Sequence, residues 1–271
     1  MRREGFLAYG ARQTTECVCA LHARLSTLAP DDLRAVEGAL AAAHRLQTCL
    51  TLFAKGYPSP RVALWKRRLR RIVRALNALR DCLRLAEWVA TQQPPPACSA
   101  GVRRAALRLR QRAETLHNTL LSAWQRWRDD HIPNEIRGLS RRWAQSFGNE
   151  AVDADYALLV WRRVQREQLA ALESPAPSLS VQCGRVRALL EACDLLAPLG
   201  LPLECPDDLQ AHYDALNAQR FREEAHRLLR ELLQGERERA LQYAGNLRGF
   251  GRLQKGWEWL MEHIGLDIIP S

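Results

Sequence analysis

The sequence contains no long apolar run. No stretch of about 18 apolar residues occurs among its 271 residues, which argues against a transmembrane helix. Residues 1–19 include basic side chains but lack the continuous apolar segment of a secretory signal. We therefore expect a cytoplasmic protein.

The eight cysteines lack the spacings that build metal sites. No CxxC pair is present, and no group of Cys and His has zinc-ligand spacing. Most lie among apolar residues of expected helices, where a free thiol packs as a small hydrophobic side chain. We expect free thiols in a reducing compartment and no bound metal, with Cys17 and Cys19 as the one pair that needs checking.

Catalytic signatures are missing as well. The sequence has no Walker A loop, no GxGxxG, no HExxH and no GxSxG. Paired carboxylates that would hold a metal for phosphoryl chemistry are also lacking. These absences predict a protein that is not an enzyme and uses no cofactor.

No segment alternates apolar and polar residues with a period of two, so no sheet is expected. Apolar residues instead recur at helical spacing between breaks that contain Pro or Gly. One helix is expected to start at Asp31 or Asp32, and a long one is expected over about 207–234. The fold class predicted is all-α.

The helices are expected to form two pseudo-symmetric antiparallel bundles, because a plan of helix, Pro-containing turn and helix occurs twice. It covers residues 33–90 and recurs, as a weak echo, over 179–234. The Pro-rich segment starting at Ser174 is the best boundary between the halves. The predicted parts are an N-terminal extension at 1–30, a first bundle repeat at 31–173 and a second at 174–271.

Positive charge is the property present in excess. The chain has 40 Lys and Arg against 30 Asp and Glu, and its net charge of +10 implies an anionic partner. Residues 61–84 hold nine of the basic residues and one acid, a net charge of +8. Their apolar residues form one stripe at helical spacing, namely Leu64, Leu69, Ile72, Val73, Leu76, Leu79 and Leu83.

The basic segment is the main candidate site. Arginines at positions 67, 70, 71 and 74 lie one, three or four residues apart, and like charges three or four apart destabilise a helix unless an anion compensates them. A guanidinium stays charged and can donate two parallel hydrogen bonds to phosphate. The alternative is a solvated face that pairs with acids of another helix, such as Glu223, Glu224 and Glu231.

Other side chains are less specific. A second basic group, with arginines at 103, 104, 108, 110 and 112, fits a solvated face as well as a site. His44 could help to bind an anion when protonated, although a packing role is the simpler interpretation. Arg80 and Asp81 are expected to brace one another locally. The tryptophans are expected to pack between helices rather than to stack on nucleic-acid bases.

The segment LRRIVRALNALRDCLRLAEWV resembles a signature of the CHAD family, the conserved histidine α-helical domains, which reads roughly LRxLxxxLGxxRDxDV. The matching residues are Leu69, Arg70, Leu76, Leu79, Arg80 and Asp81. The later LQAHYDALNAQRF is similar to the corresponding element of the family's second repeat, with Leu216 and Asn217 matching. The resemblance implies a pair of four-helix bundles around a basic cavity that binds inorganic polyphosphate.

The motif that names this family, a helix starting HxxRVxxRRLR in each repeat, is not kept. Glu37 stands where the first histidine would be, and Ser180 stands where the second would be. His44 and Arg45 retain basic character in the first repeat, and Arg187 does so in the second. The resemblance therefore supports the assignment of the fold better than the assignment of the ligand.

The hypothesis from the sequence is non-enzymatic binding of inorganic polyphosphate or a related phosphate-rich polyanion, in the cytoplasm or at polyphosphate granules. The residues predicted to bind it are Arg67, Arg70, Arg71, Arg74, Arg80, Lys66, Arg45, His44 and Arg187. One alternative is a degenerate scaffold that acts through protein partners. Another is non-specific nucleic-acid binding, which net charge alone supports.

Overall fold

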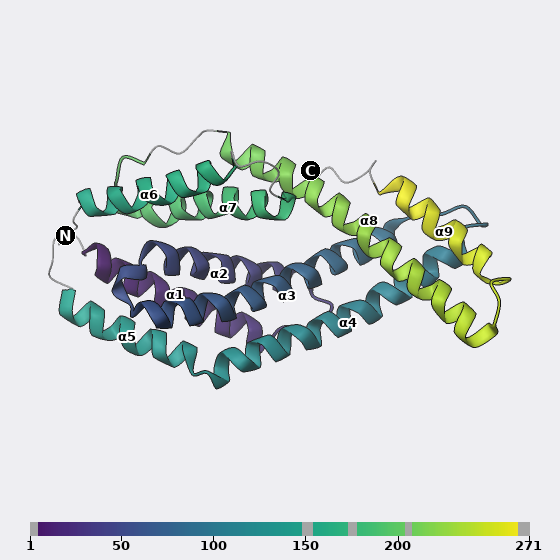
Figure 1. Cartoon of the computed structure of the whole chain (residues 1–271), viewed down its shortest axis with the longest axis horizontal. Coiled ribbons are helices and arrows are strands. Elements are labelled where there is room, and N and C mark those ends of the chain that lie inside the picture. The colour runs from purple at the N-terminus through teal and green to yellow at the C-terminus, as the bar shows by residue number, and fades with distance from the viewer. Residues whose placement is uncertain (1–4, 148–153, 173–177, 204–207, 265–271) are drawn as a thin grey trace.

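The computed structural model describes residues 5–147, 154–172, 178–203 and 208–264 (Figure 1). Within these ranges every regular element is a helix, so the all-α prediction is confirmed. No helix in the described ranges is long and apolar enough to cross a membrane. In chain order the elements are α1 (Phe6–Ser26), α2 (Leu33–Leu52), η1 (Ala54–Gly56), α3 (Ser59–Thr91), α4 (Ser99–Asp129), α5 (Ile132–Phe147), α6 (Ala154–Leu172), α7 (Leu179–Leu196), η2 (Ala197–Leu199), α8 (Leu209–Ala244) and α9 (Phe250–His263).

Helix α1 lies within the range predicted to be an N-terminal extension, and it packs between α2 and α5. Phe6 and Leu21 are buried in the core. The hydroxyl of Tyr9 donates a hydrogen bond to the carbonyl of Leu195 on α7, at 2.5 Å. Helix α1 is therefore part of the helical core. The predicted boundary at Ser174 lies outside the described residues.

The helices that carry the site begin as the sequence predicts. Asp32 is the N-cap of α2, and its carboxylate accepts a hydrogen bond from the backbone of Ala35 at 2.9 Å. Pro60 stands in the first turn of α3, where its missing N–H costs nothing. In the predicted stripe of α3 only Leu64 is partly exposed, and the others are buried. Each such side chain contributes about 1.5–3 kcal/mol to folding, which fixes how α3 is rotated.

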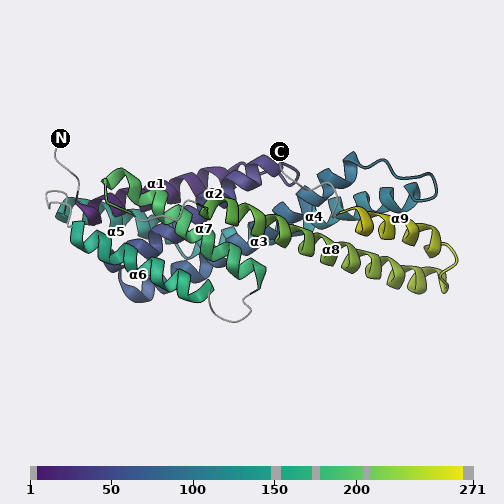
Figure 2. The same cartoon turned by 90° about the horizontal axis from the view of Figure 1, so that it is seen from above.

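Two helix pairs with the same plan face each other. A short 3-10 helix lies between α2 and α3, and another lies between α7 and α8. Figure 1 shows α7 lying along α2, while α8 leaves this body and crosses to a narrow arm formed with α9 and parts of α3 and α4. The arm also projects in the view from above (Figure 2).

Helix α8 is longer than the sequence indicated. The predicted end near residue 234 is wrong, because the helix runs to Ala244 and ends at Gly245, where φ is +64°. Gly235 stands inside the helix. The C-terminal signal was therefore the second glycine, which adopts the left-handed conformation that a helix end requires.

The tryptophans and cysteines are mostly packing residues. Trp65, Trp127 and Trp161 are buried in the core, which confirms the packing interpretation for them. The expectation of free thiols is wrong at Cys193, which is disulfide-bonded. The other described cysteines are free.

Of the pair Cys17 and Cys19 that the sequence singled out, Cys17 contacts Cys49 instead. Cys19 is exposed, whereas the buried Cys17 lies against Cys49 with 3.8 Å between the sulfur atoms.

Candidate functional site

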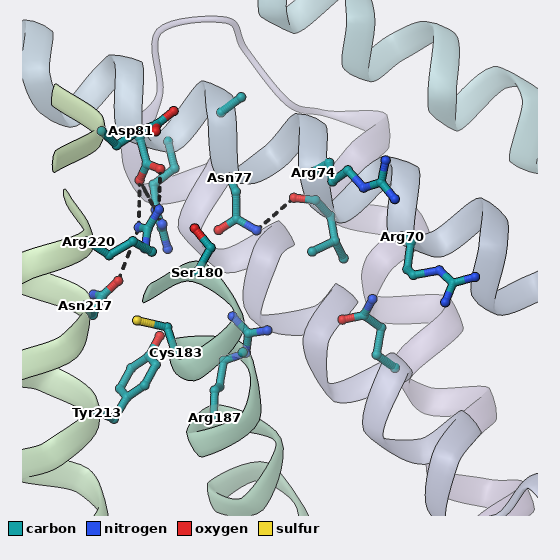
Figure 3. A pocket seen from close by; sticks show the side chains of 16 residues that line it. Arg70, Arg74, Asn77, Asp81, Ser180, Cys183, Arg187, Tyr213, Asn217 and Arg220 are labelled. Carbon is teal, nitrogen blue, oxygen red and sulfur yellow. Dashed lines mark hydrogen bonds and ion pairs between the residues drawn. The ribbon is translucent and has the colours of Figure 1, made fainter. Parts of the chain in front are cut away.

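A pocket of about 460 Å³ lies where α3, α7 and α8 converge, and we call it the central pocket. Figure 3 shows Arg70 and Arg74 on one side of it, and Asp81 with Arg220 on the other. Five arginines and two carboxylates line it, namely Arg70, Arg74, Arg80, Arg187, Arg220, Asp81 and Glu224. The pocket is therefore strongly basic.

The rotation of α3 decides which predicted arginines reach this pocket. Arg70 and Arg74 are followed at helical spacing by Asn77 and Asp81, so these four residues form one row along the helix. At about 100° per residue, Arg67 and Arg71 are turned by roughly 60° and 100° from Arg70. Both are exposed and line neither this pocket nor the one described below.

Asp81 joins the two helix pairs. Its carboxylate accepts hydrogen bonds from Arg80 at 2.8 and 3.0 Å, and from Arg220 at 2.7 and 3.1 Å. Burial would raise the pKa of Asp81, but the hydrogen bonds and charges of Arg220 and Arg80 outweigh it and hold the pKa below its ordinary value. Asp81 therefore stays ionised, and it braces Arg80 as the sequence indicated.

The other three arginines of the central pocket have no acidic partner. Among the described residues, Arg70, Arg74 and Arg187 form no ion pair. Arg70 and Arg74 are exposed at the mouth, whereas Arg187 is only partly exposed. Burial lowers the pKa of Arg187, and the hydrogen bond to Tyr213 and the charge of Glu191 oppose this shift.

Two of the acids named as possible partners of the basic helix are engaged elsewhere. Glu224 and Glu231 both pair with Arg227 of their own helix. Besides Arg80, two basic residues nearer the start of α3 are paired with acids. Arg68 pairs with Asp130 at 2.5 Å, and Arg61 pairs with Glu135 at 3.0 Å.

A second pocket of about 310 Å³, the side pocket, adjoins the central one. The two share four lining residues: Arg80, Arg187, Tyr213 and Asn217. The side pocket is also lined by Arg84 and by three carboxylates, those of Glu37, Glu191 and Asp194. Its arginines and carboxylates are equal in number, so its charge is balanced.

His44 lies in the side pocket and is 4 % exposed. Its Nε2 atom is buried without a hydrogen-bond partner. Burial, followed by the charges of Arg187, Arg80 and Arg220, lowers the pKa of His44 well below its ordinary value. The imidazole is therefore neutral near pH 7 while the pocket is empty, so it can contribute a hydrogen bond rather than a charge.

Two predicted residues lie away from both pockets. Lys66 is partly buried near Arg70, Arg163 and Glu167, and burial followed by Arg70 lowers its pKa. Arg45 donates a hydrogen bond of 3.5 Å to Gln13 on α1.

Sequence reasoning missed Arg220, Tyr213 and Arg84. Arg220 stands three residues after Asn217 and seven after Tyr213. Tyr213, Asn217 and Arg220 therefore share one face of α8. That spacing places the three residues on one face of the helix, but no local sequence pattern shows that this face packs toward α3. In the described part of the chain, no group of side chains has the composition of a metal site.

Two arginines of the second basic group pair with one remote acid. Glu236 on α8 accepts hydrogen bonds from Arg104 at 2.7 Å and from Arg108, both on α4, and from Arg239 at 2.9 Å. Burial would raise the pKa of Glu236, but the hydrogen bonds from Arg104 and Arg108 lower it overall. This cluster lies in the arm, away from the two pockets.

Comparison with known proteins gives one match. The family model of the CHAD domain matches residues 12–179, which is more than half of the chain. No curated protein matches the chain, and no solved structure does. The positions aligned above with the two histidines of that family, Glu37 and Ser180, line the side pocket and the central pocket respectively.

Proposed function

Because this chain belongs to the CHAD family, we propose that it binds inorganic polyphosphate, or a closely related phosphate-rich polyanion, in the central pocket. CHAD domains are in general associated with polyphosphate. The observation that carries the proposal is the charge of the pocket. Five arginines line it, Asp81 compensates two of them, and Glu224 is engaged by Arg227.

The unpaired arginines favour an anion that bears several charges. A guanidinium taken out of water is unfavourable, and Arg187 forms no ion pair within the described residues, although the more distant charge of Glu191 acts on it. Arg70 and Arg74 lie one helical turn apart at the mouth, so they can meet successive charged groups of one chain. Bidentate contacts from guanidinium groups suit phosphate oxygens in particular.

The lining favours polyphosphate over nucleic acid. Single-stranded nucleic acids bind through aromatic rings that stack on bases as well as through charge. Among the described residues, Tyr213 is the one aromatic residue that lines the central pocket, and its side chain is a partner of Arg187. Trp65 and Trp127 are buried in the core, so their rings offer no stacking surface.

The proposed role is binding without chemical change, in the cytoplasm and at polyphosphate granules. Incubation with polyphosphate should release no orthophosphate. Steady release that depends on Arg70 and Arg74 would contradict the non-enzymatic part of the proposal.

Two matched double variants test the site. Replacing Arg70 and Arg74 by Ala should weaken polyphosphate binding by about 3–6 kcal/mol, since each lost hydrogen bond to a charged group costs about 1.5–3 kcal/mol. Replacing Arg67 and Arg71 by Ala removes the same charge from the same helix, but at exposed positions that line neither pocket. Its effect should be much smaller, and circular dichroism should show that both variants keep their helices.

Calorimetry at fixed ionic strength measures the two affinities. Equal losses in the two double variants would mean that charge on the whole helix, rather than the pocket, determines binding. Wild-type protein that prefers RNA in competition would point to nucleic-acid binding, and no binding of either would point to a scaffold.

A further inference from the structure

The charge of the lining changes where the two pockets meet. Arg80 and Arg187 belong to both pockets and mark the junction. On the central side the lining has a large excess of arginines. Beyond the junction it contains the carboxylates of Glu37, Glu191 and Asp194.

These carboxylates oppose the entry of further phosphates. Within the described residues none of the three forms an ion pair, so none is neutralised by a guanidinium at contact distance. Burial raises the pKa of Glu191, and the charges of Arg45 and Arg187 only partly oppose this shift, so a further negative charge nearby would add to the cost of the ionised form. A polyphosphate chain that passed through the side pocket would bring one more negative charge per phosphate toward these groups.

At the junction itself, a polar ring atom has no hydrogen-bond partner. His44 is buried beside the two shared arginines, with its Nε2 atom lacking any partner. A buried polar atom without a hydrogen bond is unfavourable, and a ligand oxygen would satisfy it. Arg80, Arg187 and His44 thus offer donors from three helices around one point.

We infer that the pocket binds the end of a polyphosphate chain rather than its middle. The terminal phosphate lies between Arg80 and Arg187 and accepts a hydrogen bond from His44 in its Nε2–H form. The chain then leaves through the central pocket past Arg74 and Arg70. A terminal phosphate suits this point because it has one more ionisable oxygen than an internal one, and so more charge and more acceptors. The inference rests on the proposed function.

Stoichiometry and blocked ends test this assignment. With polyphosphates of increasing length, wild-type protein should saturate at one protein per chain end, whatever the length. Polyphosphate whose terminal phosphates are both blocked as phosphoramidates of a neutral amine should lose most of its affinity.

A number of bound proteins that grows with chain length, or equal binding of blocked and free chains, would overturn end recognition while leaving the proposed function intact. Failure to bind either form would remove the proposed function and this inference with it.

A pair of variants tests the carboxylates. Glu191→Gln with Asp194→Asn keeps the shapes of the side chains but removes two charges from the side pocket, so chains should now pass through and more protein should bind to longer chains. Glu87→Gln with Glu223→Gln changes net charge equally at exposed positions outside both pockets, and it should retain the wild-type stoichiometry. If the first variant still binds one protein per end, the carboxylates are not the barrier and the inference fails.

Discussion

Two buried carboxylates in this protein each pair with two or three arginines, but the surroundings of the two clusters differ. Asp81 is 5 % exposed and joins Arg80 to Arg220 beside the central pocket. Glu236 is 4 % exposed and holds Arg104, Arg108 and Arg239 in the arm. Around Asp81, further arginines remain unpaired and face a shared pocket, whereas at Glu236 three arginines converge directly on the acid. Both clusters hold more arginines than acids, so an excess of charge alone does not distinguish them; a group of arginines indicates a ligand where members without a carboxylate contact face a pocket.

Neutralising each acid should give the largest effects. Asp81→Asn leaves Arg80 and Arg220 without a counter-charge, and breaking a buried pair in this way should lower the free energy of unfolding by about 3–5 kcal/mol. Glu236→Gln should fall at the lower end of that range, because Arg104 and Arg239 are partly exposed and can be hydrated. Denaturant unfolding measures both.

Added polyphosphate should separate the two variants. It can replace the missing negative charge beside Arg80 and Arg220, so it should restore stability to Asp81→Asn by more than it stabilises wild type. It should not do so for Glu236→Gln. Equal rescue of both variants would break the distinction between the clusters.

Single arginines should show the same contrast at a smaller scale. Arg187→Met removes a charge that has no acidic partner, so stability should stay equal or rise. Its affinity for polyphosphate should fall by about 1.5–3 kcal/mol. Arg108→Met removes a partner of Glu236, so it should lower stability by about 1–3 kcal/mol and leave polyphosphate affinity unchanged. Denaturant unfolding measures the stability and calorimetry the affinity of both variants. A loss of affinity in Arg108→Met without one in Arg187→Met would contradict the contrast.

The sequence predicted the elements better than the pairing of charges. The apolar stripe of α3 and the cap at Asp32 are local patterns, and both were read correctly. Arg220, one partner of Asp81, lies 139 residues away from it in the chain. Arg104, one partner of Glu236, lies 132 residues away from that acid. No local pattern contains such contacts, because they depend on how α8 crosses α3 and α4.

The same limit explains which candidate arginines were placed correctly. Charge and spacing identified the whole polar surface of α3, from Arg67 to Arg80. Only part of that surface faces α7 and α8, and the part is set by the rotation that the apolar stripe imposes. Arg70, Arg74 and Arg80 therefore reach the pocket while Arg67 and Arg71 do not. His44 was identified as a possible charge, but its burial makes it a neutral group, which required the structure.

The pH dependence of stability should reveal His44. Its pKa in the folded protein lies well below the ordinary value of 6.5, whereas in the unfolded chain it returns to that value. As the pH falls through about 6.5 the unfolded state therefore binds a proton that the folded state does not, and stability declines. His44→Leu should lack this part of the decline.

Near pH 7.5 the His44→Leu variant should be as stable as wild type or more stable by about 1 kcal/mol, because it removes a buried unpaired atom. Thermal unfolding over this pH range tests both statements. An unchanged slope would contradict this prediction, because it would show that the imidazole binds its proton at the same pH in the folded and unfolded states.

The smallest effect should come from Arg239, the most exposed member of the Glu236 cluster. Its side chain is 46 % exposed, and it lies one turn from Glu236 on the same helix. Pairs of this kind contribute about 0.3–0.5 kcal/mol, and Arg104 and Arg108 still compensate the acid when Arg239 is replaced by Ala. The replacement should therefore change stability by no more than that amount and leave polyphosphate affinity within error, although it removes a full positive charge. A clear loss of affinity would mean that the arm also contacts the polyanion, and the two clusters would then have to be treated as one extended surface.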